Sequence, residues 1–101
     1  MSVAWLYVID NGRGHPKIKR KSHAGISIVQ NSIGNHTVTF PPSISRLTCV
    51  ATLNNSVGMI TAVPGDNAGR PPNTVNVLTF STPGGGFSPY DFSLAVFYGK
   101  P

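Results

Sequence analysis

The amino-acid sequence predicts an all-β domain, an antiparallel β-sandwich of about seven to eight short strands with a jelly-roll-like or squashed-barrel arrangement. Runs of alternating apolar and polar residues recur along the chain, and turn-forming residues separate them. No segment has apolar residues at the i, i+3, i+4 and i+7 positions of an amphipathic helix. In addition, 11 glycines and 9 prolines interrupt nearly every possible helix.

Length and composition indicate one domain that spans residues 1–101. The chain is 40% hydrophobic, which is enough for a core, but only 11% charged, against about 25% in typical domains. Such a surface of Ser, Thr, Asn and Gly is common in extracellular or virion β-proteins. The N-terminus lacks the basic region of a signal peptide, and no apolar run approaches the roughly 20 residues of a membrane span. We therefore expect a place on an extracellular or virion surface as part of a larger assembly.

The first half of the chain contains two strands of opposite character before a hairpin. Residues 3–9 are β-branched or aromatic and apolar on both faces, which predicts burial by the core on one side and by another layer or subunit on the other. Residues 16–21 contain a single apolar side chain, Ile18. A strand here is expected at a charged sheet edge, where lysines prevent edge-to-edge pairing.

Residues 25–41 form the clearest β-hairpin signal. The side chains of residues 26–28 and 36–40 alternate in character, and a short Asn/Ser/Gly segment joins the two runs. Gly34 lies where a tight turn needs a residue that tolerates positive φ. Pro41 ends the second strand because proline has no N–H for a ladder.

The second half of the chain continues the same pattern. Further strands are expected at residues 46–53, 57–63, 74–80 and 91–98. The turn at residues 54–56 is short, so its two flanking strands should be antiparallel neighbours. Residues 82–89 contain three consecutive glycines, and this loop is expected to be the most mobile.

The net charge of +5 is concentrated in one segment. Six basic side chains fall within nine positions: Arg13, His15, Lys17, Lys19, Arg20 and Lys21. They form a candidate site for an anion such as nucleic acid, lipopolysaccharide phosphate or an acidic polysaccharide, or else they keep an edge strand soluble. If Lys17, Lys19 and Lys21 share one face, their spacing of about 6.6–7 Å suits a track of phosphates or sulfates. No aromatic residue lies within this segment, which argues against single-stranded nucleic acid.

Aromatic residues supply a second kind of candidate site. Phe87 and Tyr90 flank Pro89 in the glycine-rich loop and are candidates for an exposed ligand-binding site. Trp5 and Tyr7 are also able to stack on sugar rings, but the two-sided apolar pattern around them favours a buried strand or a subunit interface.

The residue types of catalytic and metal sites are present without the required spacing. His15, His23 and His36 form no metal-binding pair, so neither a metal nor another cofactor is expected within one chain. His36 follows the apolar register of its strand, which favours a hydrogen-bonded core histidine. The alternative is three copies of His36 that meet on the axis of a trimer.

No catalytic motif is present either. The three acids are Asp10, Asp66 and Asp91, and turn formation explains each of them. Cys49, the single cysteine, lies in an apolar run and is expected to be a small buried residue rather than a nucleophile. There is no Gly-x-Ser-x-Gly, phosphate-binding loop or dinucleotide fingerprint. We therefore expect a protein that is not an enzyme.

One ordered series of turn and core motifs covers nearly the whole chain. Its residues are Asp10, Gly12, Gly34, residues 37–41, 49–53 and 73–77, Asp91, Phe92 and residues 94–97. In this series the chain resembles a family of small β-domains of uncharacterised function, found at the C-termini of bacterial surface or secreted proteins and of phage tail-fibre-like proteins. Because comparable fibre-tip domains are commonly trimeric, the resemblance implies a homotrimer. His36 and the basic segment depart from the pattern, so no role carries over to them.

Together these observations predict a non-enzymatic, homotrimeric interaction or fibre-tip module that binds a glycan or another cell-surface ligand. The alternative is an anion-binding module that uses the basic residues from Arg13 to Lys21 to hold nucleic acid or an acidic polysaccharide.

Overall fold

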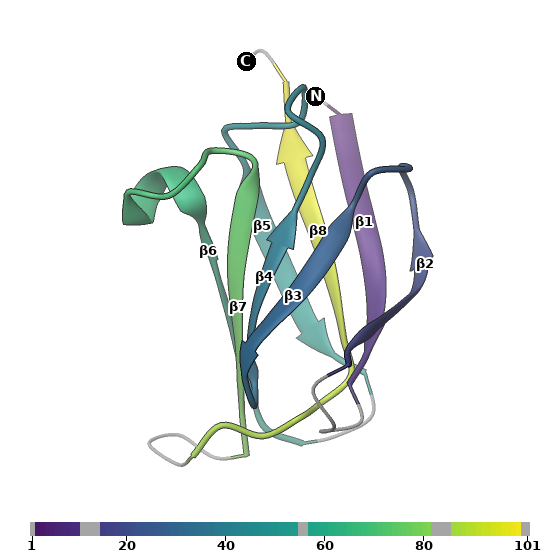
Figure 1. Cartoon of the computed structure of the whole chain (residues 1–101), viewed down its shortest axis with the longest axis vertical. Helices are drawn as coiled ribbons and strands as arrows, with labels where there is room; N and C mark the ends of the chain where they lie inside the picture. Colours follow the sequence, from purple (N-terminus) through teal and green to yellow (C-terminus); the bar gives the residue numbers. More distant parts are fainter. Residues whose placement is uncertain (1, 11–14, 55–56, 82–85, 100–101) are drawn as a thin grey trace.

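The computed structural model describes residues 2–10, 15–54, 57–81 and 86–99. These residues form eight strands and one short 3-10 helix (Figure 1). The strands are β1 (Ser2–Ile9), β2 (Lys17–Lys21), β3 (Ser27–Ser32), β4 (Asn35–Thr39), β5 (Thr48–Leu53), β6 (Met59–Pro64), β7 (Thr74–Phe80) and β8 (Phe92–Tyr98), and the helix is η1 (Gly65–Ala68). The predicted glycine-rich loop lies partly outside the described residues. A search of the described chain for a helix with the length and apolar character to cross a membrane finds none.

The strands build two antiparallel sheets that pack face to face (Figure 1). Sheet A has the order β2-β1-β8-β5, and sheet B has the order β3-β4-β7-β6. The predicted all-β sandwich is confirmed, and the two separate sheets differ from a closed barrel. The expectation that the strands flanking residues 54–56 pair with each other is wrong, because β5 pairs with β8 in sheet A and β6 pairs with β7 in sheet B. The strands nearest the two ends of the chain, β1 and β8, are neighbours at the centre of sheet A, with Ser2 opposite Tyr98 and Val8 opposite Phe92.

Alternation of side chains along each strand produces the core. On β1 the buried side chains are Ala4, Leu6 and Val8, each at most 1% exposed. Their counterparts on the other inner faces are Val38, Val75, Val77, Phe92, Leu94 and Val96. Each large aliphatic or aromatic side chain removed from water contributes roughly 1.5–3 kcal/mol, so this shared layer is the main favourable term in folding.

The outer face of β1 is not covered by another layer of the same chain. The apolar pattern of residues 3–9 predicts burial by the core on one side and by another layer or subunit on the other, and within the chain Val3 and Trp5 are 44% and 43% exposed. The reason is that the sandwich has only two layers among its described residues, so each sheet has one covered face. An exposed row of apolar side chains therefore remains on the outside of sheet A.

The predicted hairpin is confirmed as β3 and β4, which pair from Ser27 opposite Thr39 to Ser32 opposite Asn35. Gly34, in the turn, has φ 71° and is buried. A Cβ atom at this position would lie 2.8 Å from both Phe87 Cβ and Thr79 O. The turn therefore needs glycine for two reasons, its positive φ and the close approach of the segment that follows β7.

Replacement of this glycine should be more costly than replacement of a glycine with the same backbone geometry in open space. Gly69 also has φ 71°, but no atom lies within 4 Å of its added Cβ. We expect Gly69→Ala to lower the free energy of unfolding by about 1 kcal/mol, from the left-handed backbone alone. Gly34→Ala should cost about 1–3 kcal/mol more, because of overpacking. Urea denaturation of both variants measures this difference, and equal losses would contradict the steric account.

Candidate ligand-binding site

The edge strand β2 contains an irregularity that the sequence does not reveal. Tyr7 pairs with Arg20 and Val8 pairs with Ile18, so Lys19 is an extra residue between two consecutive pairs. This arrangement is a β-bulge, which interrupts the alternation of side chains between the two faces of a strand. Lys17, Lys19 and Lys21 therefore do not form a regular row along one face, and that part of the prediction is wrong.

Two of the basic residues follow the outer face of sheet A. Lys17 pairs with Ile9, and Arg20 pairs with Tyr7. Both partners alternate with the buried residues of β1, so they belong to its outer side. The guanidinium carbon of Arg20 lies 5.8 Å from the centre of the Tyr7 ring, in cation–π contact. The predicted edge position of this strand is confirmed, and both cations are exposed.

Lys21 belongs to the opposite side of the strand. It pairs with Leu6, whose side chain is buried in the core. Its ammonium group donates a hydrogen bond to the carbonyl oxygen of Ile26, at 3.2 Å. Lys21 therefore ties the edge of sheet A to the segment that leads into β3, which is a structural role.

A depression of about 260 Å³ lies beside Arg20 on the outer face of sheet A. The residues that line it are Trp5, Leu6, Tyr7, Arg20, Ser93, Leu94 and Ala95. The small side chains of Ser93 and Ala95 on β8 lie opposite Tyr7 and Trp5, so large aromatic groups border small ones across the two strands. The basic segment contains no aromatic residue of its own, but pairing with β1 places Tyr7 beside Arg20.

Hydrogen bonds fix the surroundings of this depression. The backbone N–H of Trp5 donates to Ser22 Oγ at 2.8 Å. The Asn54 side-chain amide donates to Ser93 Oγ at 2.8 Å. Aromatic side chains, the cation of Arg20 and the hydroxyl of Ser93 thus meet at one depression on sheet A. Such a combination suits a ligand with a hydrophobic face and polar edges.

The other residues predicted for ligand binding lie elsewhere. Arg13 falls outside the described residues, and His15 is exposed just before β2. Phe87 is 46% exposed, and its ring packs 5.0 Å from that of Phe80 at the end of β7 in sheet B. Tyr90 is half-buried. Phe87 and the basic residues of β2 therefore belong to different sheets.

The sequence favoured Phe87 and Tyr90 as ligand-binding residues and predicted that Trp5 is buried, because a strand with apolar residues on both faces is normally covered on both sides. The signal that identifies Ser93 and Ala95 is their small size at the outward positions of β8, opposite two aromatic residues. That signal becomes visible only once the pairing of β1 with β8 is known.

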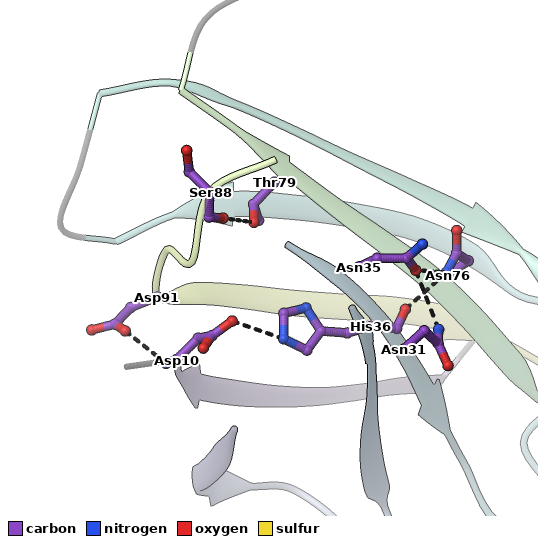
Figure 2. A network of polar contacts seen from close by, with 8 residues as sticks. All are labelled: Asp10, Asn31, Asn35, His36, Asn76, Thr79, Ser88 and Asp91. Atoms are coloured by element: carbon purple, nitrogen blue, oxygen red, sulfur yellow. Dashed lines mark hydrogen bonds and ion pairs between the residues drawn. The ribbon is translucent and has the colours of Figure 1, made fainter. Parts of the chain in front are cut away.

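Polar side chains on the outside of sheet B mainly bind one another. The Asn31 amide donates to Asn35 Oδ1 at 3.2 Å and to Thr37 Oγ1 at 2.9 Å. The Asn76 amide donates to the same Asn35 oxygen at 3.0 Å and to the carbonyl oxygen of His36 at 3.0 Å (Figure 2). Because these bonds link β3, β4 and β7, the cluster stabilises the sheet.

His36 is buried in the core beside an acid from the other sheet. Its Nε2 atom lies 2.9 Å from Asp10 Oδ2, and both side chains are 0% exposed. The backbone N–H of Asp10 donates to Asp91 Oδ1 at 2.9 Å (Figure 2). The predicted position of His36 in the core is confirmed, and its contact there is with the carboxylate of Asp10. Its alternative role at a trimer axis is wrong, because a fully buried ring cannot meet copies of itself.

Burial lowers the pKa of His36 below its ordinary value of 6.5, and the carboxylate of Asp10 opposes this shift only in part. The imidazole is therefore neutral at pH 7. A proton on Nε2 faces the Asp10 carboxylate, which leaves Nδ1 without a hydrogen-bond partner among the described residues. This pair has two of the groups of a catalytic triad, but no substrate can reach side chains that are completely buried.

Other reactive groups are similarly limited. Burial raises the pKa of the half-buried Cys49 thiol to about 11, and the negative charge of Asp66 adds to the shift. The group is thus a thiol rather than a nucleophilic thiolate at pH 7. In the described part of the chain, no group of three or more His, Cys, Asp or Glu side chains is placed to hold a metal ion.

The buried histidine should make stability dependent on pH in a definite direction. Because the pKa of His36 is lower in the folded state, protons bind the unfolded chain preferentially between that pKa and about 6.5. The free energy of unfolding should therefore decrease as the pH falls below about 6.5, by up to about 1.4 kcal/mol per pH unit from this one group. Above that pH the contribution is fully present.

Two measurements check this assignment. Nitrogen chemical shifts of the His36 ring should report a neutral Nε2–H imidazole at pH 6.5 in the wild-type protein. The difference in the free energy of unfolding between the wild type and His36→Gln should vary with pH only below about 6.5. A ring that is already protonated at pH 7 would contradict the dominance of burial.

Comparison with family models, curated proteins and solved structures finds no match to this chain. The fibre-tip family that the sequence resembles therefore remains a prediction.

Proposed function

We propose that the protein is a non-enzymatic binding module that holds a glycan on the outer face of sheet A. The observation that carries this proposal is Trp5, which is 43% exposed at the edge of a depression on a regular sheet. An indole ring is costly to leave in contact with water, and exposed apolar groups that border a hollow are typical of ligand sites. One face of a sugar ring is apolar enough to stack on it.

The neighbours of Trp5 suit the rest of a sugar. Ala95, opposite Trp5, is small enough to leave room for a ring. Ser93, one outward position along β8, has a hydroxyl that is already oriented by Asn54. These groups are positioned by strands rather than by a loop, so little conformational entropy is lost when a ligand binds.

This proposal makes a sharp distinction between two exposed aromatic residues. Trp5 and Phe87 are 43% and 46% exposed, but only Trp5 lines the depression. Trp5→Ala should reduce the affinity for a glycan found by array screening by about tenfold or more, since about 1.5–3 kcal/mol of apolar burial is lost. Phe87→Ala should change it less than twofold.

Isothermal titration calorimetry of the two variants with the same glycan provides the comparison. Loss of binding in Phe87→Ala with retention in Trp5→Ala would move the site to the residues between β7 and β8. An array with no bound glycan of any class would remove the proposal.

We also propose that the module assembles as a homotrimer, as the resemblance of its sequence implies. Exposed aliphatic side chains that a neighbouring subunit could cover include Val29 and Val63 on strands of sheet B, which are 59% and 40% exposed. Sedimentation equilibrium should give three times the mass of the chain at micromolar concentration. A single species with the mass of one chain would exclude the trimer and leave the glycan site unaffected.

A further inference from the structure

We infer that the glycan is acidic, and that Arg20 together with Lys17 binds its carboxylate or sulfate groups while Trp5 holds a sugar ring. This inference rests on the proposed function and names the chemical class of the ligand. It joins two features that are separate in the sequence, an aromatic strand and a basic strand. Their junction is the pairing of β1 with β2.

Arg20 lies close to the aromatic side chains of β1. Arg20 lines the same hollow as Trp5 and Tyr7. Tyr7 lies two positions beyond Trp5, which is about 7 Å along a strand. Arg20 lies opposite Tyr7 on the neighbouring strand, about 4.8 Å away across the ladder. A sugar stacked on Trp5 therefore has its substituents, or the next sugar, within reach of the guanidinium group.

The bulge decides which basic residues share the outer face. Between the pairs Tyr7–Arg20 and Ile9–Lys17, three steps on β2 match two steps on β1. In a regular strand, residues 17 and 20 would point to opposite faces. The extra residue, Lys19, brings Lys17 and Arg20 to the same outer face. Their spacing then follows β1 and is about 7 Å, which allows two anionic groups of one chain to be bound.

The described charged side chains on this face share one sign. Asp10 is buried beside His36, and Asp91 accepts a hydrogen bond from the Asp10 backbone. Asp66 belongs to η1, which follows a strand of sheet B. The strand pairings place no described acidic side chain on the outer face of sheet A. The two cations are therefore unopposed there, and this face attracts anions.

The stacking surfaces of this face distinguish an acidic polysaccharide from single-stranded nucleic acid. A nucleic acid strand needs several successive aromatic surfaces for its bases. Here Arg20 already lies over the ring of Tyr7, which leaves Trp5 as the principal stacking surface in the depression. A guanidinium group held in place by an aromatic ring is suited to bidentate bonding with a carboxylate or sulfate. These observations favour the polysaccharide.

The test compares two double variants that remove the same charge from the same strand. Lys17→Ala with Arg20→Ala removes the outward cations, whereas Lys19→Ala with Lys21→Ala removes the charges of the bulge position and of the inward position and keeps the extra residue of the bulge. The probes are heparin, polygalacturonate, neutral dextran and an oligothymidylate of similar length. Affinities are measured by biolayer interferometry at two salt concentrations, and thermal melts confirm that each variant is folded.

We expect the outward pair of substitutions to weaken binding to heparin or polygalacturonate by at least thirtyfold, and the other pair by less than threefold. Equal losses in both double variants would overturn the inference, because they would indicate diffuse attraction to the whole strand. Tighter binding of oligothymidylate than of either acidic polysaccharide would also overturn it.

The outcomes distinguish this inference from the proposed function. If dextran binds as tightly as the acidic polysaccharides, and Trp5→Ala abolishes binding while the outward pair does not, the glycan site stands and its acidic specificity is wrong. If none of the polysaccharides binds, the acidic specificity is wrong, and the glycan array alone decides whether the proposed function is wrong as well. If the Lys17→Ala, Arg20→Ala variant loses binding to the acidic polysaccharides alone, the result supports both the proposed function and the acidic specificity.

Discussion

The ladder between β1 and β8 is the interaction on which the other features of this domain depend. It joins strands from opposite ends of the chain at the centre of sheet A. Its inward side chains form the sheet A layer of the core, and its outward side chains place Trp5 opposite Ala95 and Tyr7 opposite Ser93. Because alternation has a period of two residues, one register fixes both the core and the outer surface. A slip of β1 by one residue would turn Trp5 and Tyr7 toward the core and expose Leu6.

The second constraint is that a sandwich of two sheets covers one face of each sheet. Inside, close packing even accommodates a polar pair, because His36 and Asp10 lie 2.9 Å apart and Asp10 in turn contacts Asp91. These contacts join β4 of sheet B to the ends of β1 and β8 in sheet A. On the outside of sheet A, by contrast, the side chain of Trp5 remains 43% exposed. The same strand therefore contributes a stabilising contact at one end and an apolar surface available for a ligand along its outer side.

Local pattern was sufficient to predict the strands, the hairpin turn at Gly34 and the charged edge strand, since each depends on residues within a few positions of one another. The features of the site depend on partners distant in sequence. The β2 bulge exists only relative to β1, and the contact of Arg20 with Tyr7 follows from the pairing of these two strands. Likewise, the contact between His36 and Asp10 depends on how the two sheets pack against each other. The exposure of Trp5 depends on how many layers cover its strand. No periodicity in a single sequence contains that information.

The central claim is that the outer face of sheet A, from Trp5 to Arg20, is where this protein meets an acidic glycan. The most direct measurement is the change in NMR chemical shifts during titration with a short polygalacturonate oligomer. The account predicts the largest shifts at the Trp5 indole N–H, the Arg20 guanidinium and the backbone amides of Ser93 and Ala95. Shifts concentrated at Phe87 and Tyr90, or on the outer strands of sheet B, would contradict it.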